Sequence, residues 1–233
     1  NNLKIIKNST VFAYMQSNYL LACQKINQKN IRQIIWKIRA KKVVLATGSI
    51  ERFITFDNND RPGIMLTNSA RKYFNYYRAD IGKKIVIFTN NDIAYRTAVD
   101  LHHENIDVQA IIDVRKDSNG SHVKQAKSYG LKIFFNHAVI NTEGRRKINS
   151  VIISEFDEKF EKIIGRPKKL SCDLLCVSGG WTPTVHLFSQ SRGKLIYRES
   201  DATFIPHKSF QEEISIGACN GTFELEKIFE ETY

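Results

Sequence analysis

Two turns built from small residues have the chemistry to hold a phosphate. The first is Thr47-Gly48, which follows the apolar run 43–46. That run is too short for a helix and is closed by a glycine, so it predicts a buried strand. Glycine has no Cβ and lets the backbone approach a ligand beyond a strand's carboxyl end, where nucleotides bind in open α/β sheets. Such turns are common in α/β proteins, so this turn alone is weak evidence for a nucleotide site and the rest of the chain must support it.

The second turn is the run of small residues 217–221, which closes a predicted strand at 213–216 and precedes a predicted helix at 223–230. Exposed amides at a strand-to-helix junction can bind an anion or a pyrophosphate. An ordinary connecting turn explains the same residues equally well. Taken alone, this turn supports both interpretations.

A third candidate lies in a βαβ unit of nucleotide type. Its elements are a predicted strand at 84–88, a helix at 93–104 and a strand at 107–114. The G-x-G-x-x-G fingerprint would fall on Thr89, Asn91 and Ala94. Ala94 suits the third position, but side chains at Thr89 and Asn91 would obstruct a pyrophosphate lying against the backbone amides.

The acidic residue that usually holds the ribose remains in this unit as Asp113. We interpret the unit as one that has kept the nucleotide fold and lost the ligand. The alternative is an altered site in which Asn90 or Asn91 donates from its side chain.

No residue makes a convincing catalytic centre. The histidines are His102, His103, His122, His137, His186 and His207. They lack the partner spacing of a metal site, and no Ser/His/Asp grouping stands out. His186 follows a Gly-Gly-Trp-Thr-Pro turn and could face a cofactor, with capping or packing as the plainer explanation. We assign no catalytic residue and no metal ligand.

The elements around these turns alternate in type. Residues 3–38 carry short apolar runs broken by polar turns, which predict a small antiparallel β-meander leading into the strand at 43–46. A helix is predicted from Thr67 to about residue 79, with its aromatic residues packed against two neighbours or forming a stacking platform. Further predictions are a helix at 121–129, a strand beginning at 130, hairpin strands within 139–153, a basic linker at 165–169, a strand at 171–178 and a helix at 185–190.

The composition fits an ordinary globular protein. The 233 residues are 42% hydrophobic and 25% charged, enough for one large domain or two small ones. No apolar run is long enough to span a bilayer and no leader precedes the first strand, so we expect a cytoplasmic location and no membrane. The net charge of +11 is dispersed, which favours a solvated surface over an acidic partner subunit and disfavours nucleic acid.

The four cysteines indicate packing more than redox chemistry. Cys172 and Cys176 are expected on one face of a strand, roughly 13 Å apart, which excludes a disulfide between them. We expect each to be a small buried apolar residue.

The order of these features resembles the two-dinucleotide-domain flavoproteins of the pyridine nucleotide-disulfide reductase type. It consists of the A-T-G turn, an interposed βαβ domain and a return strand ending in G-A-x-N-G. The expected fold is α/β: a split FAD/NAD(P)-binding Rossmann-like domain with an inserted second nucleotide-fold βαβ domain and a small antiparallel β-meander. We place the first domain at 1–78 and 167–233, and the inserted domain with its degenerate phosphate loop at 79–166.

Five stretches of the sequence resemble a more specific family, the α subunits of heterotetrameric sarcosine oxidases. They are residues 44–52, 58–63, 88–96, 172–188 and 217–221. In that family the α subunit carries NAD in its first dinucleotide domain, the β subunit carries FAD, and FMN lies between them. The complex oxidises sarcosine to glycine, and a folate-binding domain of α passes the one-carbon unit to tetrahydrofolate. The residues that the resemblance implies at the NAD site are Val11, Thr47, Gly48, Ala218, Asn220, Gly221, Phe223 and Leu225.

The resemblance also implies partners: a flavin-bearing β subunit, small subunits of a hetero-oligomer and a small-molecule amine substrate. The family's first G-x-G-x-x-G and its folate domain are not in this sequence, which starts at Asn1 without a methionine. We therefore expect a piece of a longer protein that is inactive alone. The alternatives are a subunit of a related amine, opine or proline oxidoreductase with FAD in the same site, and a structural subunit with no working nucleotide site.

Overall fold

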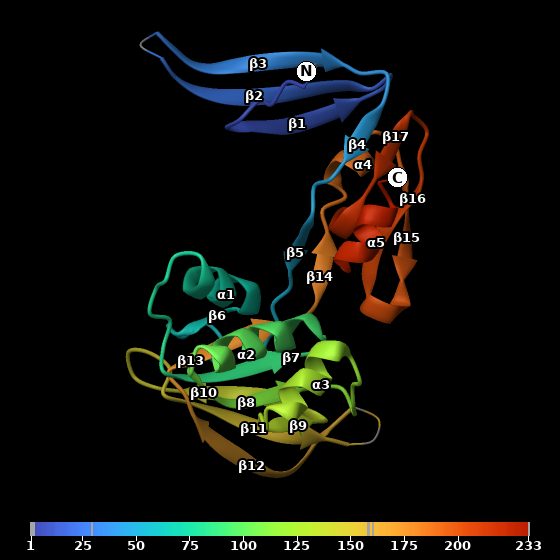
Figure 1. Cartoon of the computed structure of the whole chain (residues 1–233). Helices are drawn as coiled ribbons and strands as arrows, with labels where there is room; N and C mark the ends of the chain where they lie inside the picture. Colours follow the sequence, from blue (N-terminus) through green and yellow to red (C-terminus); the bar gives the residue numbers. More distant parts are fainter. Residues whose placement is uncertain (1–2, 29, 158, 160, 233) are drawn as a thin grey trace. The chain divides into compact units, whose positions relative to one another are not determined.

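The computed structural model describes residues 3–28, 30–157, 159 and 161–232. The chain forms two compact units, one made of Asn1–Ile50 with Trp181–Tyr233 (unit 1) and one made of Glu51–Gly180 (unit 2) (Figure 1). The predicted domain boundaries followed residues 78 and 166, whereas the compact units change after residues 50 and 180. Among the described residues, no helix is long and apolar enough to cross a membrane.

Unit 1 begins with the predicted antiparallel meander. Its strands are β1 (Ser9–Met15), β2 (Tyr19–Gln28) and β3 (Ile31–Arg39), in the order β1-β2-β3. Asn18 turns the chain between the first two strands with a positive φ of 49°, a conformation that asparagine adopts more readily than most residues. The side chain of Asn18 accepts a hydrogen bond from the Tyr14 hydroxyl at 2.7 Å, which ties the turn to the core.

A pair of short parallel strands forms the centre of unit 1. The strand predicted at 43–46 is β4 (Val43–Leu45), and it pairs with β17 (Glu213–Ser215). Val43 and Leu45 point into a core that includes Tyr14, Leu20 and Phe188. On the opposite face Val44 is exposed, as the alternation of a strand requires.

Short elements complete unit 1. They are β5 (Ser49–Glu51, which ends in unit 2), β14 (Trp181–Pro183), α4 (His186–Gln190), β15 (Lys194–Arg198), a 3-10 turn at Glu199–Asp201, β16 (Thr203–Lys208), a 3-10 turn at Gly217–Asn220, and α5 (Leu225–Glu230). β5 pairs with β14, and β15 pairs with β16. The helices predicted at 185–190 and 223–230 are therefore present in shorter form.

Unit 2 contains a parallel sheet covered on both faces. The strand order is β6 (Ile64–Leu66), β13 (Leu174–Ser178), β7 (Lys84–Thr89), β8 (Asp107–Asp113) and β9 (Ile133–Phe135). The helices α1 (Thr67–Asn75), α2 (Ile93–His103) and α3 (Ser121–Ser128) cover one face. A second meander of β10 (His137–Glu143), β11 (Ser150–Phe156) and β12 (Ile163–Ser171) covers the other (Figure 1).

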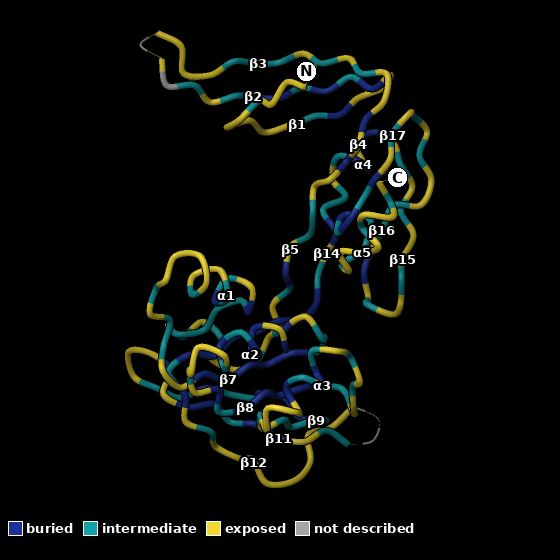
Figure 2. The backbone as a smooth tube through the Cα atoms, in the orientation of Figure 1, coloured by how far each residue is buried: buried dark blue, intermediate teal, exposed yellow. Residues whose placement is uncertain are grey.

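Burial on both faces explains the apolar strands of unit 2. Ile85 and Ile87 pack toward the helices, whereas Val86 and Phe88 pack toward the meander. Figure 2 shows buried residues concentrated along these strands. The predicted βαβ unit is confirmed, and the expected fold class is correct: a mixed α/β structure with a parallel sheet.

Three expectations about unit 2 are wrong. The basic linker expected at 165–169 lies within strand β12, which is at the edge of its sheet and exposes its lysines. α1 ends at Asn75, and the tyrosines that we expected to be buried are exposed, since only Ala70 and Phe74 of its apolar residues pack on the sheet. Cys172 and Cys176 do not share a face, because β13 begins only at Leu174.

Cys172 and Cys176 are otherwise as expected. Cys172 and Cys176 are buried free thiols on opposite faces of the sheet. Burial raises the pKa of Cys172 to about 12 and also raises the pKa of Cys176. Both side chains are therefore neutral apolar residues at physiological pH.

Candidate functional site

The carboxyl ends of β4 and β17 lie side by side because the two strands are parallel. The Ile216 amide donates to the Leu45 carbonyl at 3.0 Å, and the Cys219 thiol donates to the same carbonyl at 3.1 Å. These bonds bring the 217–221 turn next to the chain that leads into Thr47-Gly48. The two turns that the sequence offered as candidate phosphate sites thus belong to one edge of one sheet.

The turn at Thr47-Gly48 is held from one side and open on the other. Gly48 has a φ of +74°, in the left-handed region that favours glycine. The Thr47 hydroxyl donates to the Thr184 carbonyl at 2.6 Å, and the Thr184 amide donates to the Gly48 carbonyl at 2.9 Å. Apart from Gly48 and its two chain neighbours, no atom of the described chain would lie within 4 Å of a Cβ at Gly48. The backbone here is accessible from the open side.

The second turn, residues 217–222, is a compact loop. Gly217 and Gly221 both have positive φ values, of 68° and 78°. A Cβ at Gly221 would lie 2.6 Å from Nη2 of Arg198, whose guanidinium donates to the Gly221 carbonyl at 2.9 Å. Arg198 is itself paired with Asp201 at 2.7 Å. Gly221 is therefore required both for its backbone conformation and for close packing.

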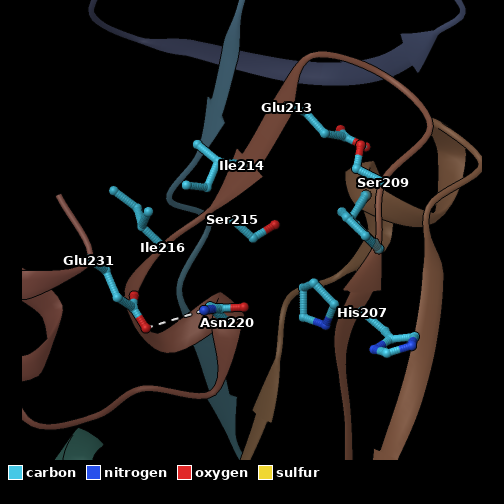
Figure 3. Close-up of a pocket in the computed structure, with 10 residues that line it drawn as sticks. His207, Ser209, Glu213, Ile214, Ser215, Ile216, Asn220 and Glu231 are labelled. Carbon is cyan, nitrogen blue, oxygen red and sulfur yellow. Dashed lines mark hydrogen bonds between the residues drawn. The ribbon is translucent and has the colours of Figure 1, made fainter. Parts of the chain in front are cut away.

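A carboxylate of the same chain occupies the donors of this loop. Oε2 of Glu231 accepts from the Gly217 amide at 2.7 Å, and Oε1 accepts from Nδ2 of Asn220 at 3.2 Å and from the Thr222 hydroxyl. Figure 3 shows Glu231 directed at Asn220. Burial acts to raise the pKa of Glu231, but donation from Thr222, Gly217 and Asn220 outweighs it and lowers that pKa.

A pocket of about 380 Å³ adjoins the loop in unit 1. Its polar lining includes His207, Glu213, Ser215 and Glu231 (Figure 3). The Ser215 hydroxyl is buried and has no hydrogen-bond partner among the described residues. Oε1 of Glu213 accepts hydrogen bonds from the hydroxyls of Ser191 and Ser209, so this carboxylate links neighbouring segments of unit 1.

The other residues implied by the resemblance are less tightly grouped. Phe223 follows the loop and its ring lies 6.4 Å from that of Trp181, while Leu225 begins α5 with 66% of its surface exposed. Val11 lies on β1 of the meander, and in the described structure no hydrogen bond connects it to the loop. Ala218, Asn220 and Gly221 are within the loop itself.

Sequence reasoning missed Glu231 and Thr222. Thr222 follows a run of small residues and could have been included as a donor by its position alone. Glu231 could not, because it is one of four glutamates between residues 224 and 231 and nothing local distinguishes it. Only the return of α5 beside Gly217 makes it special.

The corresponding turn of unit 2 has its polar groups satisfied internally. The Thr89 hydroxyl accepts from the Asn91 amide at 3.1 Å. Nδ2 of Asn91 donates to the carbonyl of Ser178 at 3.2 Å and to its hydroxyl at 3.0 Å. Asn90 donates to the Gly179 carbonyl at 3.3 Å. The asparagine side chains thus tie the turn to the neighbouring strand end.

Asp113 of unit 2 is fully buried and already paired. It accepts from the Tyr95 hydroxyl at 2.7 Å and from Nε and Nη2 of Arg115 at 3.0 and 2.7 Å. Burial raises the pKa of Tyr95, and the negative charge of Asp113 raises it further. This carboxylate contributes to the core of unit 2 and does not face solvent. Among the described residues, no group of three or more His, Cys, Asp or Glu side chains could hold a metal ion.

Comparison with known proteins gives the same family as the sequence resemblance. No protein-family model matches the chain. The chain is 36% identical over 229 residues to the sarcosine oxidase subunit alpha of Corynebacterium sp. (strain P-1), covering 94% of this chain and 23% of that protein. It is 29% identical over 230 residues to the subunit alpha of Rhizobium meliloti (strain 1021), covering 95% and 22%. The chain therefore spans about a quarter of the length of these relatives, and the predicted resemblance is confirmed over that length.

Solved structures share the fold at low sequence identity. Thioredoxin reductase of T. acidophilum matches with a TM-score of 0.67 at 15% identity, covering 96% of this chain and 69% of that one. L-proline dehydrogenase from P. horikoshii matches with a TM-score of 0.57 at 20% identity, covering 91% and 36%. An FAD-dependent pyridine nucleotide-disulphide oxidoreductase from Desulfovibrio vulgaris matches at 0.61 and 17% identity, covering 91% and 53%. These matches confirm the predicted FAD/NAD(P)-binding type of fold.

Proposed function

We propose that this chain is the dinucleotide-binding section of a sarcosine oxidase-type α subunit and that it holds NAD at the turns following β4 and β17. The observation that carries the binding site is the loop 217–222, where three donors already converge on one anionic group. Phosphate oxygens need the same kind of donor as a carboxylate. The identity of 36% to an α subunit supports the family assignment.

The proposed roles follow from what each group offers. Gly48 leaves its backbone open to a ligand, and Thr47 fixes the turn through Thr184. Gly217, Asn220 and Thr222 would donate to phosphate oxygens, with the small side chain of Ala218 leaving room beside them. Val11, Phe223 and Leu225 would provide apolar contacts to the rest of the dinucleotide. NAD can accept a hydride when bound, but no residue here is proposed to transfer one.

The chemistry of the complex is proposed from the family resemblance described in the sequence analysis. The whole assembly would oxidise the N-methyl amine sarcosine to glycine and pass the one-carbon unit to tetrahydrofolate. FAD and FMN would be held with the flavin-bearing β subunit, and small subunits would complete the hetero-oligomer. The inserted nucleotide-type domain of this chain would then be structural, since its turn and Asp113 are occupied by its own side chains.

A second candidate is FAD in the same site, as in a related amine, opine or proline oxidoreductase. The similarity of the fold to L-proline dehydrogenase favours this alternative. The adenine dinucleotide part is common to FAD and NAD, so the loop and the Gly48 turn suit both.

The test is to purify the intact α subunit in its complex, denature it, and identify the released dinucleotide by mass spectrometry. Because the β subunit should release one FAD per complex in every case, the amounts decide. NAD among the released dinucleotides supports the proposal, and a second FAD per complex without NAD supports the alternative. One FAD per complex without NAD would mean that α is a structural subunit. The Gly48→Val variant should lose the dinucleotide. Gly130→Val is the matched control, because Gly130 has a φ of +71° and equally open surroundings but lies in unit 2.

A further inference from the structure

We propose that Glu231 is an internal anion that occupies the phosphate-binding loop at rest and must leave when a dinucleotide binds. The proposal rests on the proposed function and adds a regulatory step to it: the segment carrying α5 gates the site. It concerns the contact between Glu231 and residues 217–222, all within unit 1.

The contact has the features of an anion site. One carboxylate takes a backbone amide from Gly217, a side-chain amide from Asn220 and a hydroxyl from Thr222. Its pKa is lowered by these donors, so the group is ionised at neutral pH. A phosphate would need the same donors and would be repelled by the carboxylate's charge. The two anions therefore exclude one another.

The segment that carries Glu231 is weakly anchored. α5 has six residues, and none of its described side chains is buried. Leu225 and Phe229 are 66% and 56% exposed, whereas Ile228 approaches the loop, 3.5 Å from the position of a Cβ at Gly217. A segment with few buried contacts opens at low free-energy cost. Glu231 and Ile228 are therefore the principal ties between α5 and the loop.

Space for the displaced carboxylate exists beside the loop. Glu231 and Asn220 both line the pocket of about 380 Å³ (Figure 3). Glu231 can thus leave its donors without moving a core side chain. The Ser215 hydroxyl, buried and without a partner among the described residues, lines the same pocket and offers a hydrogen bond there.

The experiment compares NAD binding by the intact protein and by the Glu231→Gln variant, using isothermal titration calorimetry after the bound dinucleotide has been removed. Glutamine keeps the size and the accepting oxygen but removes the charge. We expect NAD to bind about tenfold more tightly to Glu231→Gln, since bonds to a neutral acceptor are weaker and easier to displace. Glu230→Gln is the control. It removes an equal charge from the adjacent position, and among the described residues Glu230 makes no hydrogen bond to the loop, so its effect should be below about twofold.

The outcomes separate the two proposals. Tighter binding by Glu231→Gln alone supports the gate, and so does binding seen only in that variant. Equal or weaker binding by Glu231→Gln overturns the gate and leaves the NAD site standing. No binding by any form overturns both.

A second measurement protects the test against misfolding of the variant. In the unchanged protein, the NMR signal of the Gly217 amide should shift on addition of inorganic pyrophosphate as the carboxylate is displaced. In Glu231→Gln the same signal should move at a lower pyrophosphate concentration, because the neutral acceptor is easier to displace. An amide signal that does not respond to pyrophosphate at concentrations that compete with NAD would contradict the displacement.

Discussion

The loop 217–222 of unit 1 and the turn 89–91 of unit 2 each follow the carboxyl end of a parallel strand, yet their polar groups find hydrogen-bond partners in different ways. In unit 2 the asparagines bond to the neighbouring strand end, and Asp113 is enclosed by Tyr95 and Arg115. In unit 1 the loop donors bond to the carboxylate of an exposed segment. This difference fits the roles proposed for the two units. In unit 2 buried side chains fill the places of ligand contacts, which suits a structural domain, and in unit 1 the donors are held by a side chain that a dinucleotide could displace.

The largest effect on stability should come from removing the buried carboxylate of Asp113 in unit 2. Asp113→Ala removes the acceptor of Tyr95 and Arg115, so we expect the free energy of unfolding to fall by about 3 kcal/mol or more. Urea denaturation followed by circular dichroism measures it. Asp117→Ala, at an exposed position, is the control and should change little. A small loss at Asp113 would mean that the site of unit 2 is not structural.

Gly48 and Gly221 of unit 1 should differ in the stability lost when each is replaced by alanine. Both have positive φ values, so Gly48→Ala and Gly221→Ala each cost about 1 kcal/mol in backbone strain. Gly221→Ala should lose about 2–3 kcal/mol in total, because its Cβ would crowd Arg198 and Ile205. Thermal unfolding of the pair measures the difference. Equal losses would show that the loop yields to the added atom.

Removing one hydrogen-bonding side chain from the unit 2 turn that follows β7 should have a moderate effect on stability. Asn91→Ala loses the bonds to Ser178, and we expect about 1 kcal/mol less stability and no change in dinucleotide content. The measurements are urea denaturation and mass spectrometry of the released cofactor. A loss of cofactor would revive the altered-site alternative, in which Asn90 or Asn91 donates to a ligand.

The smallest effect concerns pH. The pKa of Glu231 is lowered in the folded state, so its contribution to stability is present above the unfolded pKa and is lost as pH falls through the folded one. Because the side chain is partly exposed, we expect its contribution to the free energy of unfolding to fall by less than about 1 kcal/mol between about pH 5 and pH 3. The unfolding free energies of Glu231→Gln and of the unchanged protein should converge at the acid end. Parallel curves would show that the carboxylate makes no stabilising contact.

Much of the fold could be predicted from patterns along the chain. The strands of the parallel sheet are continuous apolar runs because both of their faces are buried, and β7 and β8 fall at the predicted positions. Strand β12 escaped prediction because it is an exposed edge strand in which Pro167 lies opposite a register shift. Local composition there resembles a linker, and only pairing with β11 makes it a strand.

The candidate site was predictable only in part. Glycines at strand ends identify the turns, since their backbone conformations are local properties. The bonds of Glu231 to the loop depend on how α5 folds back, and the pairing of Asp113 with Tyr95 depends on the packing of α2 against β8. Neither appears in the spacing of residues along the sequence.

The two ends of unit 2 are joined by hydrogen bonds, and this bears on the order in which the chain folds. The Arg52 amide donates to the Gly180 carbonyl at 2.8 Å, and the Gly179 amide donates to the Arg52 carbonyl at 2.7 Å. For unit 1, whose two segments are separated by the whole of 51–180, an unfolded insert is a long loop that is entropically costly to close. Once the insert has folded, its ends meet and the same connection becomes short. Unit 2 would then act as a template that brings β4 and β17 within reach of one another.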